Sequence, residues 1–172
     1  MNDELKENIK NTVQKTVPFL LSLVFVLFGY VPASLGIPID LRPAGGMICV
    51  FYWVLHRSDL FNMFSVFFLA LIADFLSSAP LGVEIVSYLA VYVCVSNLSK
   101  FFSNKPFLLV WYGFAFIFTV AEILKWLLVS VYYAEFLPLA PLFFMIFFTI
   151  ACYPVIGFVN DLAQRYLIND EG

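Results

Sequence analysis

Three ionisable residues, Asp74, Glu122 and Lys125, lie inside long apolar stretches of the sequence. Charges in such stretches are expensive to bury, and they usually face the protein interior or a water-filled cavity. Glu122 and Lys125 are three residues apart, so they share one face of a helix. The apolar stretches that hold these charges begin at Leu60 and Phe107. A helix rises about 1.5 Å per residue, so Asp74 lies roughly 21 Å from the start of its stretch and Glu122 roughly 22 Å from the start of its own. The three charges therefore fall at a similar depth.

We expect Asp74 to lie within reach of Lys125, directly or through water, so that Asp74, Glu122 and Lys125 form one buried polar cluster. Pairing is the cheapest way to keep such groups ionised in an apolar setting. Glu84 is a further candidate member of the cluster. Three interpretations stay open: a proton or substrate relay, a polar pin that fixes the helix register, and a lysine that extends its amino group toward the outer membrane surface.

The common catalytic signatures are missing from the sequence. It contains no HExxH, GxSxG or P-loop motif, and no cluster of metal ligands. A protease dyad made of Asp74 and Glu122 is disfavoured because Lys125 would oppose a shared proton. The three cysteines are far apart, and we interpret them as plain thiols. We therefore predict a protein that is not an enzyme and that needs no cofactor or metal.

The composition indicates the class of protein that carries these charges. Of 172 residues, 63% are apolar and 12% are charged, whereas a soluble domain has about a quarter charged residues. A soluble core of this size could not hold 21 phenylalanines beside the aliphatic residues. The net charge is only −3 and no basic block occurs, so a nucleic-acid partner is not expected. We predict an all-α membrane protein with one compact domain surrounded by lipid.

A crossing helix needs about 20 apolar residues. The candidate spans are residues 17–36, 43–55, 60–76, 82–97, 107–132 and 139–162. The second is short enough to be re-entrant, but then Arg57, Lys100 and two further basic residues would lie outside, against the positive-inside rule. We predict six transmembrane helices with both termini in the cytoplasm. The domains are then a cytoplasmic segment 1–16, a transmembrane domain 17–163 and a cytoplasmic tail 164–172.

Residues 41–95 carry a recognisable pattern. Arg42-Pro43 opens the second span, Tyr52-Trp53 follows, and after a polar turn comes ALIADFLSSAPLGVE at 70–84. The motif residues in order are Asp74, Ser77, Pro80, Leu81, Gly82 and Glu84. This pattern resembles the MreD family of bacterial rod shape-determining membrane proteins, which has a motif like GxxxDxxSxxxLG between its middle spans. Ala70 stands where many members have glycine, and alanine is small enough to keep a close helix contact.

The resemblance implies a non-enzymatic scaffold of the cell-elongation and peptidoglycan-synthesis machinery, located in the bacterial inner membrane as a multi-pass protein. It implies direct binding of MreC, and through MreC an indirect link to MreB, RodA and the class B penicillin-binding transpeptidase. It also implies a fold similar to the substrate-binding subunits of energy-coupling-factor vitamin transporters. A substrate-binding membrane subunit of a small-molecule transporter is therefore the alternative function.

The two functions differ in the site that each requires. A binding subunit needs an outward-open cavity of a few hundred Å³ with convergent polar groups, whereas a scaffold should bury its polar cluster and leave an apolar flank for a partner. The few polar residues within the spans favour the scaffold. The turn from Ser77 to Glu84 is a candidate contact for a periplasmic partner. Small residues at 44–46, and at 113 and 115, are interpreted first as internal packing.

Overall fold

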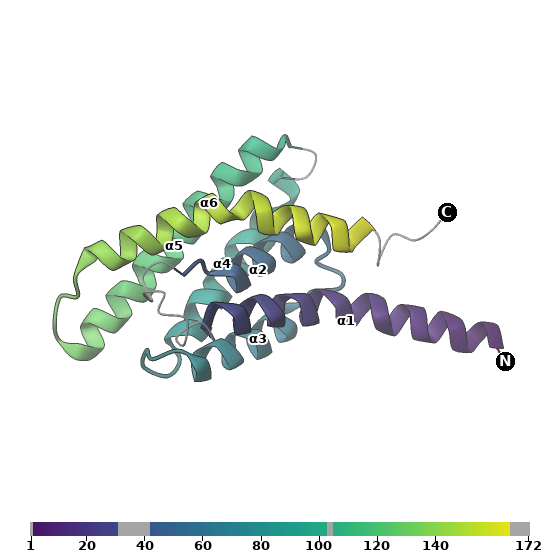
Figure 1. Cartoon of the computed structure of the whole chain (residues 1–172), viewed down its shortest axis with the longest axis horizontal. Coiled ribbons are helices and arrows are strands. Elements are labelled where there is room, and N and C mark those ends of the chain that lie inside the picture. The colour runs from purple at the N-terminus through teal and green to yellow at the C-terminus, as the bar shows by residue number, and fades with distance from the viewer. Residues whose placement is uncertain (1, 31–41, 103–104, 166–172) are drawn as a thin grey trace.

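The computed structural model describes residues 2–30, 42–102 and 105–165, with side chains from Thr16 onward. These residues form six α-helices and no strand: α1 (Asn2–Tyr30), α2 (Gly45–His56), α3 (Met63–Leu76), α4 (Val83–Phe102), α5 (Phe107–Tyr133) and α6 (Leu139–Ala163) (Figure 1). The predicted all-α class is confirmed.

Helix α2 is the centre of the bundle and packs against α1, α4, α5 and α6. Every residue from Gly45 to Val54 is buried. With 12 residues, α2 is roughly 18 Å long, shorter than the roughly 30 Å hydrocarbon core. Because other helices surround it, the length of α2 is not matched directly to lipid.

Three helices, α4, α5 and α6, are long and apolar enough to cross a membrane, whereas Thr16–Tyr30, α2 and α3 are shorter apolar helical stretches. Many large apolar side chains on the long helices are exposed, such as Phe116 on α5 and Phe147 and Phe158 on α6. Such surfaces suit hydrocarbon and not water. The chain is a helical membrane protein.

The predicted span boundaries agree best at the C-terminal end. Helices α5 and α6 match the expected 107–132 and 139–162 to within one residue at each end. Helix α4 continues to Phe102, past the expected end at 97. Helix α1 runs without a break through the expected boundary at residue 16. The end of the expected first span falls in 31–41, outside the described residues.

An aromatic cluster holds α2 between α5 and α6. The ring centroid of Phe51 on α2 lies 5.2 Å from that of Phe114 on α5 and 5.9 Å from that of Tyr153 on α6. The rings of Phe114 and Tyr153 stack with centroids 4.5 Å apart. Pairs of this kind contribute about 0.5–1.5 kcal/mol beyond their buried area. The cluster thus fixes the position of α5, which carries Glu122 and Lys125.

Candidate functional site

Asp74 lies in the last turn of α3 and binds the start of α4. Its Oδ2 accepts a hydrogen bond of 2.7 Å from the Gly82 backbone N–H, and its Oδ1 accepts one of 3.1 Å from the Glu84 N–H. The first backbone N–H groups of a helix have no partner within that helix and carry partial positive charge. A buried carboxylate can therefore be satisfied there without a cation. Asp74 is the cap that joins α3 to α4.

The other motif residues shape the same turn. The Ser77 hydroxyl donates to the Asp74 carbonyl at 3.2 Å and accepts from the Ala79 N–H at 3.3 Å. Gly82 has a φ of 96°, in the left-handed region that glycine adopts most readily. No side-chain crowding accounts for Gly82, because a Cβ there would meet nothing within 4 Å. The backbone conformation alone explains the glycine.

Leu81 differs from its neighbours because its side chain points away from the protein. It is 77% exposed, whereas Asp74 and Glu84 on either side of the turn are buried. Pro80 contributes its carbonyl, which accepts from the Val83 N–H at 3.3 Å. The turn thus presents one large apolar side chain on a backbone held by internal hydrogen bonds.

Lys125 on α5 forms the centre of a buried ionic cluster. Its Nζ lies 2.6 Å from Glu84 Oε1 on α4 and 3.9 Å from Glu122 Oε2 on its own helix. The two glutamate side chains are almost fully buried, and the lysine side chain is 17% exposed. Breaking a buried pair leaves an uncompensated charge and typically costs about 3–5 kcal/mol. The cluster therefore ties α4 firmly to α5.

The direct form of the predicted contact between Asp74 and Lys125 is not found within the described ranges. Glu122 and Lys125 do lie together, but within the described part of the chain no ion pair joins Asp74 to Lys125, and Glu84 takes that place. The two carboxylate oxygens of Asp74 already accept the backbone N–H groups of Gly82 and Glu84 at the start of α4. Depth along the helices placed Asp74 at the right level, but it could not reveal that the free helix start was its partner.

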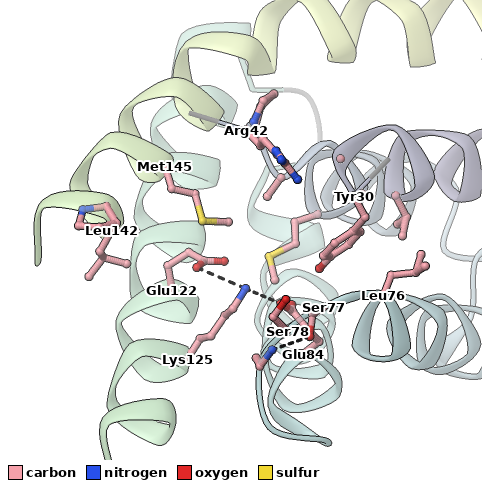
Figure 2. Close-up of a pocket in the computed structure, with 18 of the residues that line it drawn as sticks. Tyr30, Arg42, Leu76, Ser77, Ser78, Glu84, Glu122, Lys125, Leu142 and Met145 are labelled. Carbon is pink, nitrogen blue, oxygen red and sulfur yellow. Dashed lines mark hydrogen bonds and ion pairs between the residues drawn. The ribbon is translucent and has the colours of Figure 1, made fainter. Parts of the chain in front are cut away.

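The ionic cluster forms one wall of a cavity of about 570 Å³. Figure 2 shows Glu122 and Lys125 on one side, with Tyr30 and Arg42 across from them. Other wall residues include Val26, Tyr88, Trp126, Leu142 and Met145. The motif residues Pro43, Ser77 and Glu84 also line the cavity, whereas Pro80, Leu81 and Gly82 do not appear among its lining residues.

The aromatic part of this wall was not predicted from the sequence. Tyr30, Tyr88 and Trp126 line the cavity, although aromatic residues near span ends are normally read as interfacial anchors. For Tyr88 and Trp126 the sequence offers one signal, which is nearness to a charged residue: Tyr88 is one turn after Glu84, and Trp126 follows Lys125. Tertiary packing alone brings them to one space.

Two of the small residues expected to allow close packing, Gly46 and Gly113, lie at tight contacts with other helices. A Cβ at Gly46 would lie 2.6 Å from the Tyr88 Oη and would also collide with Val26. At Gly113 a Cβ would lie 2.5 Å from the Phe102 Cε1. Both glycines therefore permit contact between helices of this chain, as interpreted from the sequence.

Among the residues that the structure describes, no group of three or more His, Cys, Asp or Glu side chains is arranged to hold a metal ion. Cys49 is buried, Cys152 is half-buried and Cys94 is exposed, and all three are free thiols. The site's chemical resources are therefore the buried carboxylates, the amino group of Lys125, the guanidinium of Arg42 and the tyrosine hydroxyls.

Comparison with known proteins finds one relative of similar length. The chain is 28% identical over 167 residues, 95% of both chains, to a protein of Rickettsia prowazekii (strain Madrid E) described as "Uncharacterized protein RP566". No family model matches the chain, and no solved structure matches it.

Proposed function

We propose that this chain is an MreD-type scaffold: a non-enzymatic, multi-pass protein of the bacterial inner membrane that binds MreC and supports rod cell shape. In this proposal MreC links it to MreB, RodA and the class B penicillin-binding transpeptidase. The proposal begins from the resemblance of residues 41–95 to the MreD motif. It is supported by the way the motif residues are used in the structure.

The observation that carries the proposal is the α3–α4 turn. Asp74, Ser77 and Gly82 hold the backbone of the turn internally, and Leu81 is left 77% exposed at its surface. A rigid turn with one projecting apolar side chain suits contact with another protein, because little conformational entropy is lost on binding. We infer that the turn contacts the part of MreC beside the outer membrane surface.

Six crossings with both termini in the cytoplasm belong to the same proposal. An even number of crossings agrees with Figure 1, where α1 begins and α6 ends at the same end of the long axis. The described connections between α3 and α4 and between α5 and α6 are short. Single cysteines introduced at Ser58 and Glu135, in a variant without the native cysteines, should be labelled from inside and outside respectively. Labelling of both from the same side would contradict the topology.

Restoration of cell shape tests the function. The chain, expressed with MreC from the same organism in a rod-shaped bacterium depleted of its own MreD, should restore rods. A Gly82→Val variant should fail, because a β-branched residue is strained at φ 96°. Gly157→Ala is the matched control, since its Cβ would meet only ordinary contacts. Round cells with wild-type protein present in the membrane at normal level would oppose the proposal.

The cavity favours a second candidate, the substrate-binding membrane subunit of a small-molecule transporter. Its volume of about 570 Å³ falls in the range of about 300–1,000 Å³ typical of ligand pockets. Charged and tyrosine side chains converge on it from several helices (Figure 2). Native mass spectrometry of the chain purified in mild detergent tests this candidate. A retained small molecule of defined mass would support it, and a protein found only in its unliganded mass would count against it.

A further inference from the structure

We propose that the cavity beside Lys125 binds a small organic cation, an ammonium group on an apolar or aromatic body, with the Glu122 carboxylate as the acceptor of the ammonium N–H. This proposal names the substrate class of the second candidate function, the transporter subunit, and as a substrate site it rests on that function. It is also compatible with the scaffold, where the bound cation would stabilise the junction of α4 and α5.

The charge balance of the cluster favours a cation. Two carboxylates, Glu84 and Glu122, share one ammonium group, that of Lys125. Lys125 is 2.6 Å from Glu84 but 3.9 Å from Glu122, so Glu84 holds the closer and stronger pairing. One negative charge is therefore left on the side of Glu122. Arg42 also lines the cavity and has an interaction partner of its own, so this charge count refers only to Glu84, Glu122 and Lys125.

The hydrogen bonding of Glu122 leads to the same conclusion. The Oε1 atom of Glu122 is buried and has no hydrogen-bond partner within the described residues. A buried acceptor without a donor costs about 1–3 kcal/mol, and more when it is charged. Glu122 lies on the cavity wall between Met145 and Lys125 in Figure 2. This atom has almost no accessible surface, so a donor in the cavity would satisfy it after a small rotation of the Glu122 side chain toward the cavity.

The remaining walls suit an apolar or aromatic body. The apolar lining includes Trp126 on α5, Leu142 and Met145 on α6, and Val26 on α1. Aromatic faces attract cations and thioether side chains adapt to irregular ligands. An anionic ligand beside Glu122 is disfavoured, because the cation there, Lys125, is already held by two carboxylates. The pocket thus combines one carboxylate oxygen that lacks a hydrogen-bond donor in the described part of the chain with apolar surroundings.

The probe for this site is 2-phenylethylamine, which is protonated at neutral pH. Its uncharged analogue 2-phenylethanol and the anion 3-phenylpropionate have a similar ring and chain length. Isothermal titration of the purified full chain in mild detergent should show saturable binding of the amine at least tenfold tighter than binding of either analogue. Equal binding of the three compounds, or no saturable binding of the amine, would overturn the proposal.

Two variants assign the binding to the cavity. Glu122→Gln should weaken binding of the amine at least tenfold, while Glu135→Gln, which changes an exposed carboxylate outside the cavity, should leave it unchanged. Met145→Phe fills part of the cavity without altering the ionic cluster and should also weaken binding, which keeps the test informative if Glu122→Gln misfolds. Amine binding that survives in Met145→Phe and in every folded Glu122 variant would overturn the site. Because MreC is absent from this assay, its failure is distinct from failure of the scaffold proposal.

Discussion

Lys125 Nζ lies 2.6 Å from Glu84 Oε1, and this contact joins α5 to the first turn of α4. The backbone N–H of the same Glu84 donates to Asp74 at the end of α3. Glu84 therefore links two buried polar contacts, one through its side chain and one through its main chain. Three helices meet at this residue, next to the cavity.

The Glu84–Lys125 pair should show strong energetic coupling. Lys125→Met leaves two buried carboxylates without their cation and should reduce the free energy of unfolding by about 3–5 kcal/mol. Adding Glu84→Gln removes one of those charges, so the double variant should be more stable than the sum of the single effects predicts, by at least about 1 kcal/mol. Thermal unfolding of the four proteins in one detergent measures the coupling. Additive effects within about 0.5 kcal/mol would contradict the pairing.

Asp74 should behave as a helix cap. Asp74→Ala removes the acceptor for two N–H groups of α4 and should cost about 1–2 kcal/mol. Asp74→Asn keeps one acceptor oxygen and should cost less. Because Lys125 is paired elsewhere, combining Asp74→Ala with Lys125→Met should give more nearly additive effects than the Glu84 cycle does. A larger coupling of Asp74 to Lys125 than of Glu84 to Lys125 would refute this assignment.

Close packing at Gly46 predicts a size limit at that position. Gly46→Ala places a Cβ against Val26 and Tyr88 and should destabilise the protein by about 1–3 kcal/mol through overpacking. Gly157→Ala is again the control, because the nearest atom to its Cβ would be 4.0 Å away. The midpoint of thermal unfolding should fall for the first variant and stay level or rise for the second. Equal midpoints would show that the α1–α2 contact can open without cost.

The turn between α2 and α3 should add a small pH-dependent stability. The Arg57 side chain donates two hydrogen bonds to Asp59, each 3.2 Å, and these lower the pKa of the Asp59 carboxyl group. A carboxyl group whose pKa is lower in the folded state stabilises the fold at pH values above its unfolded pKa, which is about 4 for aspartate. This stabilisation is lost as the pH falls through the pKa of the folded state. The side chain is 62% exposed, so the effect should stay below about 1 kcal/mol. Wild type and Asp59→Asn should differ at pH 7 and converge at low pH; a gap that widens on acidification would contradict the contact.

The sequence predicted the helical class and the positions of α5 and α6 because these spans are long, apolar and bounded by prolines or charges. It also predicted that Glu122 and Lys125 share a face, which follows from helix periodicity alone. It favoured Asp74 over Glu84 as the partner of Lys125, whereas the direct ion pair is with Glu84, because residue depth places Asp74 and Glu84 at nearly the same level. Asp74 caps α4 and Glu84 pairs with Lys125 because their side chains point in different directions, and the sequence does not show those directions.

The cavity could not be predicted from the sequence. Its wall combines Tyr30 and Val26 from α1 with Leu142 and Met145 from α6, residues more than a hundred positions apart. No local pattern encodes a space left between helices, because its volume depends on how far α1 and α6 diverge around α2. The sequence shows that the spans hold few polar residues, but it does not show that these residues converge on one wall of a cavity.

Co-purification with MreC tests the scaffold proposal most directly. The chain and MreC from the same organism should elute as one complex in mild detergent, and Leu81→Ser should weaken that complex without lowering the unfolding temperature. Phe136→Ser, which changes another highly exposed apolar residue just after the C-terminal end of α5, should leave the complex intact. Clean separation of well-folded wild-type chain from MreC would contradict the scaffold.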